Sequence, residues 1–139
     1  MEALHAEADI IAQIINQIIL RGSLPEDKVT FGHVLDRLRK QNLATNVVAE
    51  IEAFRNSREF KYINAFCNTI KHRRLINKEW RVERRARYKE GVRFLAFTYK
   101  EDNFPVTWAS DINGSYRETL GRYVEGIGNA IIDYLQSNP

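Results

Sequence analysis

Apolar residues recur at helical spacing near the start of the chain. Between Leu4 and Ile18 they return every three or four positions, which predicts a long amphipathic helix over residues 2–21. Ile10 and Ile19 widen the stripe, so we expect this helix to pack against two neighbours, or against one neighbour and a second subunit. Gly22 is predicted to end it, because glycine readily adopts the left-handed conformation of a helix cap.

Three further helices are predicted before residue 75. The first covers residues 30–41, and the second starts at Asn42 or Thr45 and continues the same period. Ser57 then breaks the pattern and is a good N-cap for the next helix, with Glu59 favourably placed in its first turn.

The helix that starts at Ser57 separates its apolar and polar residues on a helical wheel. The apolar arc contains Phe60, Tyr62, Ile63, Phe66, Cys67 and Ile70. A contiguous polar stripe contains Asn64, Asn68, Lys71 and His72. Because Arg73 and Arg74 would fall back into the apolar arc, we expect the helix to leave the core near residue 72.

Near residue 80 the hydrophobic period changes to two. Trp80 and Val82 alternate with Arg81 and Glu83, which predicts a strand over residues 80–89 with one wet, basic face. Turns are expected at Glu90-Gly91 and at 101–103, and β-forming runs cover residues 92–99 and 104–109. These segments predict a small antiparallel meander.

The last helix is predicted to begin at a capping box, Ser115-Tyr116-Arg117-Glu118. Gly121 and Gly128 lie on one face of it, which suggests a close approach to another helix. The predicted fold is therefore mainly α and forms a single domain over residues 1–139. It is an up-and-down bundle of about five helices with a β-meander (about residues 79–109) inserted before the last helix.

Composition and the number of cysteines indicate the compartment in which the protein is expected. The chain has 139 residues, of which 44% are hydrophobic and 28% charged, as in an ordinary globular domain. Cys67 is the single cysteine, so no intrachain disulfide can form, and a reducing compartment is expected. The acidic N-terminal segment is unlike a signal peptide, and polar residues interrupt the isoleucine-rich run, so we expect a cytoplasmic protein without a membrane span.

Positive charge is concentrated in one segment. Residues 71–89 carry nine Lys/Arg and two Glu, a local charge of +7, which leaves −4 elsewhere because the total is +3. Such a patch suits an anionic partner, since phosphate contacts release counterions. The alternative is a solvated basic face without a partner.

The candidate chemistry lies at the end of the helix that starts at Ser57. Asn68 and His72 are four residues apart and so share a helix face, with Lys71 and Arg73 beside them. A histidine next to cations suits metal-independent cleavage of RNA through the 2′-hydroxyl. The alternative is an Asn/His pair that stabilises a helix end or packs across a dimer. Neither a metal site nor a cofactor-binding loop is expected from the residue spacings.

The segment Cys67-Asn68-Thr69-Ile70-Lys71-His72 resembles the motif of the HEPN family, Arg-Asn-x-x-x-His. Asn68 and His72 match it, and Cys67 stands at the arginine position. The resemblance implies an all-helical homodimer in which two motif helices form one cleft. Catalytic members of the family are metal-independent ribonucleases, often toxins or phage-defence factors, and other members bind RNA or nucleotides.

Together these features predict an RNA- or nucleotide-binding protein, with ribonuclease activity in its catalytic version. His72 would act as the acid and base, and Asn68 would orient it or the phosphate. Seven cations are expected to hold phosphate: Lys71, Arg73, Arg74, Lys78, Arg81, Arg85 and Arg87. One alternative is a non-catalytic homodimer that docks its basic segment on an acidic protein, and another is a β-ribbon that binds duplex DNA.

Overall fold

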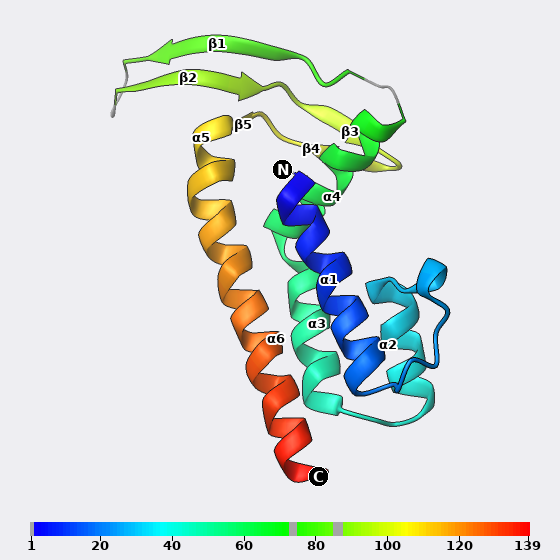
Figure 1. The fold of residues 1–139 in the computed structure, drawn as a ribbon. Helices are drawn as coiled ribbons and strands as arrows, with labels where there is room; N and C mark the ends of the chain where they lie inside the picture. The colour runs from blue at the N-terminus through cyan, green and yellow to red at the C-terminus, as the bar shows by residue number, and fades with distance from the viewer. Residues whose placement is uncertain (1, 73–74, 85–87) are drawn as a thin grey trace.

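The computed structural model describes residues 2–72, 75–84 and 88–139. Within these residues five longer helices form the body of the protein, with small antiparallel sheets before the last of them (Figure 1). The longer helices are α1 Glu2–Ile18, α2 Phe31–Lys40, α3 Thr45–Asn56, α4 Arg58–Lys71 and α6 Arg117–Ser137. The short ones are η1 Glu26–Lys28, α5 Ala109–Asp111 and η2 Ile112–Tyr116. The predicted combination, mainly α with a small β insertion, is confirmed.

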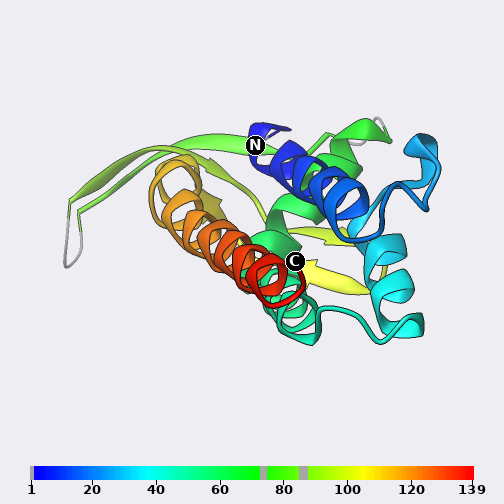
Figure 2. The same cartoon turned by 60° about the horizontal axis from the view of Figure 1, so that its bottom comes forward.

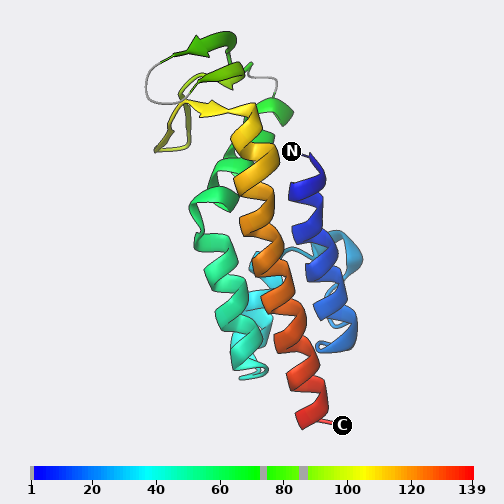
Figure 3. The same ribbon diagram turned by 90° about the vertical axis from the view of Figure 1, so that its left-hand side faces the viewer.

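The helices run lengthwise and the strands lie across one end of the bundle (Figure 3). α3 and α4 follow one another in the same general direction, so α4 reaches the end where the sheets lie (Figure 1). The β1–β2 hairpin extends away from the helices into solvent (Figure 2). One end of the molecule therefore combines the end of α4 with the strands.

Side-chain caps begin two of the helices: the cap at Ser57 was predicted and is confirmed, and the cap at Thr30 was not predicted. The Thr30 side chain accepts a hydrogen bond from the backbone N–H of His33 at the start of α2. Ser57 Oγ accepts from Phe60 N (3.2 Å) and donates to Phe54 O (2.7 Å), so this buried serine both ends α3 and begins α4. The first turns of α2 and α4 are thus specified locally by their sequence.

The α1 stripe is divided between the core and the surface. Ala12 and Ile15 are fully buried, whereas Ile10, Ile14 and Ile18 form an exposed row at four-residue spacing. α1 ends at Ile18, earlier than expected, and Gly22 adopts the left-handed conformation that was predicted for it (φ 69°). Ile19 is buried, so of the two residues predicted to widen the stripe only Ile10 is exposed.

The β segment forms two sheets. β1 (Lys78–Glu83) pairs with β2 (Lys89–Phe94), which pairs with β5 (Thr107–Trp108), and all pairs are antiparallel. β3 (Phe97–Tyr99) and β4 (Asp102–Phe104) form a separate two-stranded sheet. The predicted run over residues 92–99 is thus divided between two strands.

The predicted turn at Glu90-Gly91 is wrong. Gly91 lies inside β2 opposite Arg81, with a φ of 144° that other residues rarely adopt. The glycine therefore provides an unusual strand conformation, and the chain reverses earlier, between Glu83 and Lys89. The turn predicted at residues 101–103 lies at Lys100 and Glu101 instead, because Asp102 already pairs with Tyr99.

The predicted capping box is also wrong. The last helical segment begins at Ala109 and passes through a π-helical turn at Ile112–Tyr116 before α6. Ser115 therefore lies inside the helix, and its hydroxyl donates to Asp111 O (3.1 Å) rather than capping a terminus. The motif resembles a helix start, but the chain is already helical when it reaches it.

The glycines of α6 give a direct test of its packing. A methyl group added at Gly121 or Gly128 meets nothing within 4 Å, whereas at Gly126 it meets Glu50 Oε2 at 2.8 Å. Gly121→Ala should raise the free energy of unfolding by about 0.5–1 kcal/mol, because alanine loses less entropy in a helix. Gly126→Ala should raise it less, because the Glu50 carboxylate must move.

Urea unfolding followed by circular dichroism measures both changes as shifts of the midpoint. A loss of stability in Gly121→Ala would contradict the open surroundings of that residue.

Candidate nucleic-acid interface

α4 holds the predicted site at its C-terminal end. Tyr62, Ile63 and Phe66 are buried as the wheel predicted, and Asn64 and Asn68 are half-buried beside them. Ile70 departs from the prediction, because it is 49% exposed while Thr69 is buried with its hydroxyl donating to Ala65 O (2.8 Å). The helix ends at Lys71, so it leaves the core where expected.

Asn68 and His72 are joined through the backbone. His72 occupies the C-cap of α4, and its N–H donates to Asn68 O (3.1 Å). The Asn68 amide instead points back along the helix and donates to Asn64 O (2.8 Å) and Asn64 Oδ1 (3.1 Å). Asn68 thus holds the preceding turn of α4, and the His72 side chain is exposed to solvent.

His72 borders a shallow hollow. Thr69, His72, Tyr99 and Lys100 line a space of about 400 Å³ where the end of α4 meets the β3–β4 turn. Lys100 Nζ lies 5.6 Å from the centroid of the Tyr99 ring, and Lys71 is exposed nearby on the last turn of α4. An imidazole, two amines and a phenol therefore lie at one surface of this end.

Cys67 lies in the core. Its side chain is 5% exposed, among the residues that α4 packs against its neighbours. The position that holds arginine in the HEPN motif therefore faces the interior of this fold. An arginine there could not reach a ligand at the surface without leaving the packed face of α4.

The predicted phosphate-binding residues do not form a single face. Because side chains alternate along a strand, Lys78 and Arg81 project from opposite faces of β1. Arg84 is exposed just after β1. Four of the predicted residues, Arg73, Arg74, Arg85 and Arg87, lie outside the described residues.

Ion pairs occupy two carboxylates of the hairpin, Glu79 and Glu83. Arg93 Nε lies 2.5 Å from Glu79 Oε1, and Arg93 Nη1 lies 3.1 Å from Glu83 Oε1. Lys89 Nζ lies 2.6 Å from Asp111 Oδ1 and 5.1 Å from the Trp108 ring centroid. Lys71, Lys78, Arg81 and Arg84 have no ion pair among the residues that the structure describes. Their charges are therefore free to meet an external anion.

One face of the hairpin presents aromatic side chains to solvent. Trp80 is 68% exposed and Tyr88 is 66% exposed, with Val82 between them on the same side. The Tyr88 hydroxyl donates to a Glu90 carboxylate oxygen, and this hydrogen bond raises the pKa of Tyr88 above its usual value. The prediction that only the basic face of this strand is exposed is wrong, because Trp80 and Val82 on its other face are exposed as well. The hairpin they belong to projects beyond the helices (Figure 2).

Comparison of the chain with protein-family models, curated proteins and solved structures finds no match. In the described parts of the chain, no cluster of three or more His, Cys, Asp and Glu residues is arranged to hold a metal ion. No helix in those parts has the length and apolar character needed to cross a membrane.

The burial of Cys67 predicts the effect of restoring the motif. Cys67→Arg should lower the free energy of unfolding by roughly 3 kcal/mol or more, because a guanidinium would be desolvated in the core. Cys67→Val is the matched control, since it is apolar and of similar size, and should change stability by less than about 1.5 kcal/mol.

Urea unfolding of the two variants gives this comparison. Equal stability of Cys67→Arg and the unmodified protein would mean that position 67 can turn to the surface, as the HEPN motif requires.

Proposed function

We propose that the protein binds single-stranded RNA through the β1–β2 hairpin and the adjacent end of α4. One observation carries the proposal: the hairpin presents two exposed aromatic rings, Trp80 and Tyr88, beside cations that have no carboxylate partner among the described residues. The rings provide surfaces for unpaired bases, and the cations provide contacts for phosphates.

The chemistry of single-stranded nucleic acid suits both features. Stacking of a base on an aromatic side chain contributes about 1–3 kcal/mol and requires no particular sequence. When a base covers an exposed ring, apolar surface is removed from water, which adds a hydrophobic contribution to the binding free energy. Lys78 projects from the same face of β1 as Trp80, and Arg84 is exposed just after this strand, so the backbone of an RNA strand lying across the rings would meet positive charge. Arg81 projects from the opposite face of β1, and Lys71 is exposed at the end of α4.

The aromatic contribution is tested by removing one ring. Trp80→Ala should weaken binding of a fluorescein-labelled RNA oligomer about tenfold, as expected for the loss of one stacked base. Fluorescence anisotropy measures the affinity. Trp108→Phe is the control, because Trp108 packs under Lys89 and Arg93 within the fold. In that variant Trp80 is the remaining tryptophan, and its fluorescence should be quenched when RNA binds.

A salt titration in the same assay tests the charges and separates the alternatives. The logarithm of the affinity should fall linearly with that of the salt concentration, and Lys78→Ala, on the Trp80 face of β1, should reduce the slope by roughly one unit. Lys28→Ala, on η1, should leave it unchanged. Absence of RNA binding at low salt would favour an acidic protein partner, and stronger binding of duplex DNA would favour a β-ribbon in a groove.

Ribonuclease activity is a second candidate, which the exposure of His72 beside Lys71 and Lys100 supports. In this mechanism His72 removes the proton of a ribose 2′-hydroxyl, and the 2′-oxygen attacks the adjacent phosphorus to form a 2′,3′-cyclic phosphate. The P–O5′ bond breaks, and the leaving 5′-oxygen keeps the bonding electrons and takes up a proton from water or from protonated His72. The nearby amines would stabilise the charge that develops on the phosphate.

His72→Ala should abolish cleavage of single-stranded RNA in EDTA, while RNA binding persists because the hairpin is intact. His33→Ala is the control, since the His33 ring contacts Lys28 O within the α2 region, away from this end. Cleavage by His72→Ala at the normal rate would exclude His72 from the chemistry.

A homodimer is part of the proposal. The exposed row of Ile10, Ile14 and Ile18 supports it, because α1 packs beside α4 and carries an uncovered apolar face. In a HEPN-like arrangement two copies would bring their α4 ends together and unite two copies of His72 in one cleft.

A further inference from the structure

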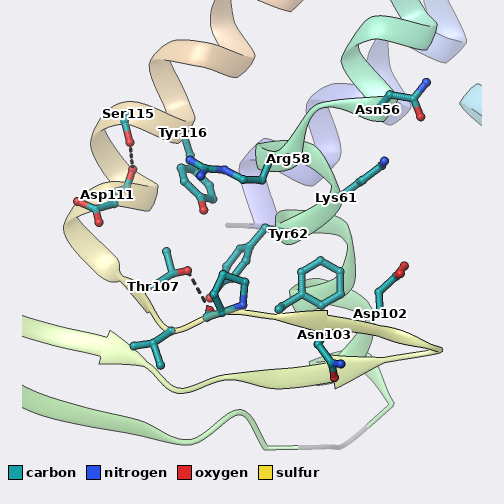
Figure 4. Close-up of a pocket in the computed structure, with 13 residues that line it drawn as sticks. Asn56, Arg58, Lys61, Tyr62, Asp102, Asn103, Thr107, Asp111, Ser115 and Tyr116 are labelled. Atoms are coloured by element: carbon teal, nitrogen blue, oxygen red, sulfur yellow. Dashed lines mark hydrogen bonds between the residues drawn. The ribbon is translucent and has the colours of Figure 1, made fainter.

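A larger cavity lies at the opposite end of α4 from His72. It has a volume of about 550 Å³ and is enclosed by the start of α4, the segment from β4 to β5 and the turn that leads into α6 (Figure 4). α4 has 14 residues, so the two ends of this helix are about 20 Å apart. The cavity is therefore a separate location from His72, and neither Trp80 nor Tyr88 lines it, although β2 of the hairpin reaches its edge through the Lys89–Asp111 ion pair. Its size is that of small-molecule sites.

Aromatic rings form the interior of this cavity. Tyr62 and Tyr116 are buried and meet edge to face with centroids 5.6 Å apart, and Phe104 lies 6.0 Å from Tyr62. Pro105 and Val106 complete the apolar part of the wall. A flat apolar group is the shape that such a wall accommodates best.

Two cations lie at the mouth on the α4 side. Arg58 reaches over the ring of Tyr116, with its guanidinium carbon 6.0 Å from the ring centroid (Figure 4). It lies 3.5 Å from Glu59, but this pair is exposed at Arg58 and so is weak. Lys61, one turn later, has no ion pair among the described residues. The guanidinium is thus available to an anion that enters beside Tyr116.

The two carboxylates that line the cavity, Asp102 and Asp111, do not neutralise Arg58. Asp111 is bound by Lys89 Nζ at 2.6 Å. Asp102 and Asn103 project from the β4 side, across the opening from Arg58 (Figure 4). An anionic group is therefore attracted to the α4 side, while the Asp102 carboxylate can accept a hydrogen bond from a donor at the other end of a ligand; Asn103 Oδ1 already accepts from Thr98 (2.8 Å).

Tyr62 contributes an unsatisfied donor. Its side chain is 1% exposed, and its hydroxyl has no hydrogen-bond partner of ordinary geometry among the described residues. Burial raises the pKa of Tyr62; Thr107 beside it opposes this rise, but the Thr107 hydroxyl donates to Pro105 O (3.1 Å). A buried hydroxyl without a partner is costly, and such groups in native proteins often belong to binding sites.

We infer that this cavity binds a small organic anion with a planar ring. Arg58 holds its phosphate or carboxylate group, the ring lies against Tyr62 and Tyr116, and a ligand acceptor takes the hydrogen bond of the Tyr62 hydroxyl. Because that hydroxyl is closed to solvent, we expect the lining residues beside it to move as the ligand enters.

Isothermal titration with phenyl phosphate and with benzoate tests the inference and distinguishes the two anionic groups. At least one should bind with a Kd of about 1 mM or lower, as expected for ligands of this size. Inorganic phosphate, which lacks the ring, and benzyl alcohol, which lacks the charge, should each bind at least about tenfold more weakly. Absence of binding by both ring-bearing anions at ~10 mM, about ten times that Kd, would overturn the inference.

Variants assign the contacts. Arg58→Gln should weaken binding of the preferred probe about tenfold, Lys61→Ala about threefold, and the exposed Lys40→Ala not at all. Tyr62→Phe should weaken it roughly fivefold while leaving the unliganded protein at least as stable, because it removes an unpaired buried hydroxyl. Undiminished binding by Arg58→Gln or by Tyr62→Phe would overturn the assignment.

Binding of the probe by Trp80→Ala shows whether this site is independent of the proposed RNA-binding surface. Trp80→Ala should bind the probe as tightly as the unmodified protein, because Trp80 does not line the cavity. Loss of probe binding in Trp80→Ala would contradict two independent sites.

Discussion

The cluster of aromatic rings on one face of α4 is the packing interaction on which the position of the β segment depends. Phe66 lies 4.8 Å from Phe94 of β2, and Tyr62 lies 5.5 Å from Phe97 of β3 and 6.0 Å from Phe104 of β4. Such pairs contribute about 0.5–1.5 kcal/mol each beyond the area they bury. Because three strands each contribute a ring to the same helix, α4 holds both sheets at one end of the bundle.

This attachment explains why the hairpin is exposed and why the cavity exists. Phe94, at the inner end of β2, packs on α4, and Lys89, at its outer end, is paired with Asp111, whereas Trp80 on β1 remains uncovered. At the other end of the cluster, Tyr62 and Phe104 separate the start of α4 from the strands and form the wall of the cavity. Both proposed sites therefore follow from one set of contacts.

Sequence features that act over a few residues, such as helix caps, predicted the helices well, because caps are local interactions. Ser57 acts as predicted since it needs only Phe54 and Phe60, both three residues away. The predictions from local sequence were wrong where contacts between residues far apart in the chain determine the conformation. Gly91 is in a strand because it pairs with Arg81, and Ser115 is inside a helix because the chain becomes helical at Ala109, directly after β5. Neither context can be recognised from the neighbouring sequence.

The same distinction applies to the sites. The concentration of charge and the spacing of Asn68 and His72 were visible in the sequence, but the burial of Cys67 and the turning of Asn68 towards Asn64 were not. The cavity had no local signal, because it joins residues 56–62 to residues 102–116. A spacing motif identifies residues that share a helix face but not which face is buried. In this fold the packing of α4 buries the position that holds arginine in the motif, which is why we propose binding at the hairpin rather than the arginine-dependent chemistry that the motif implies.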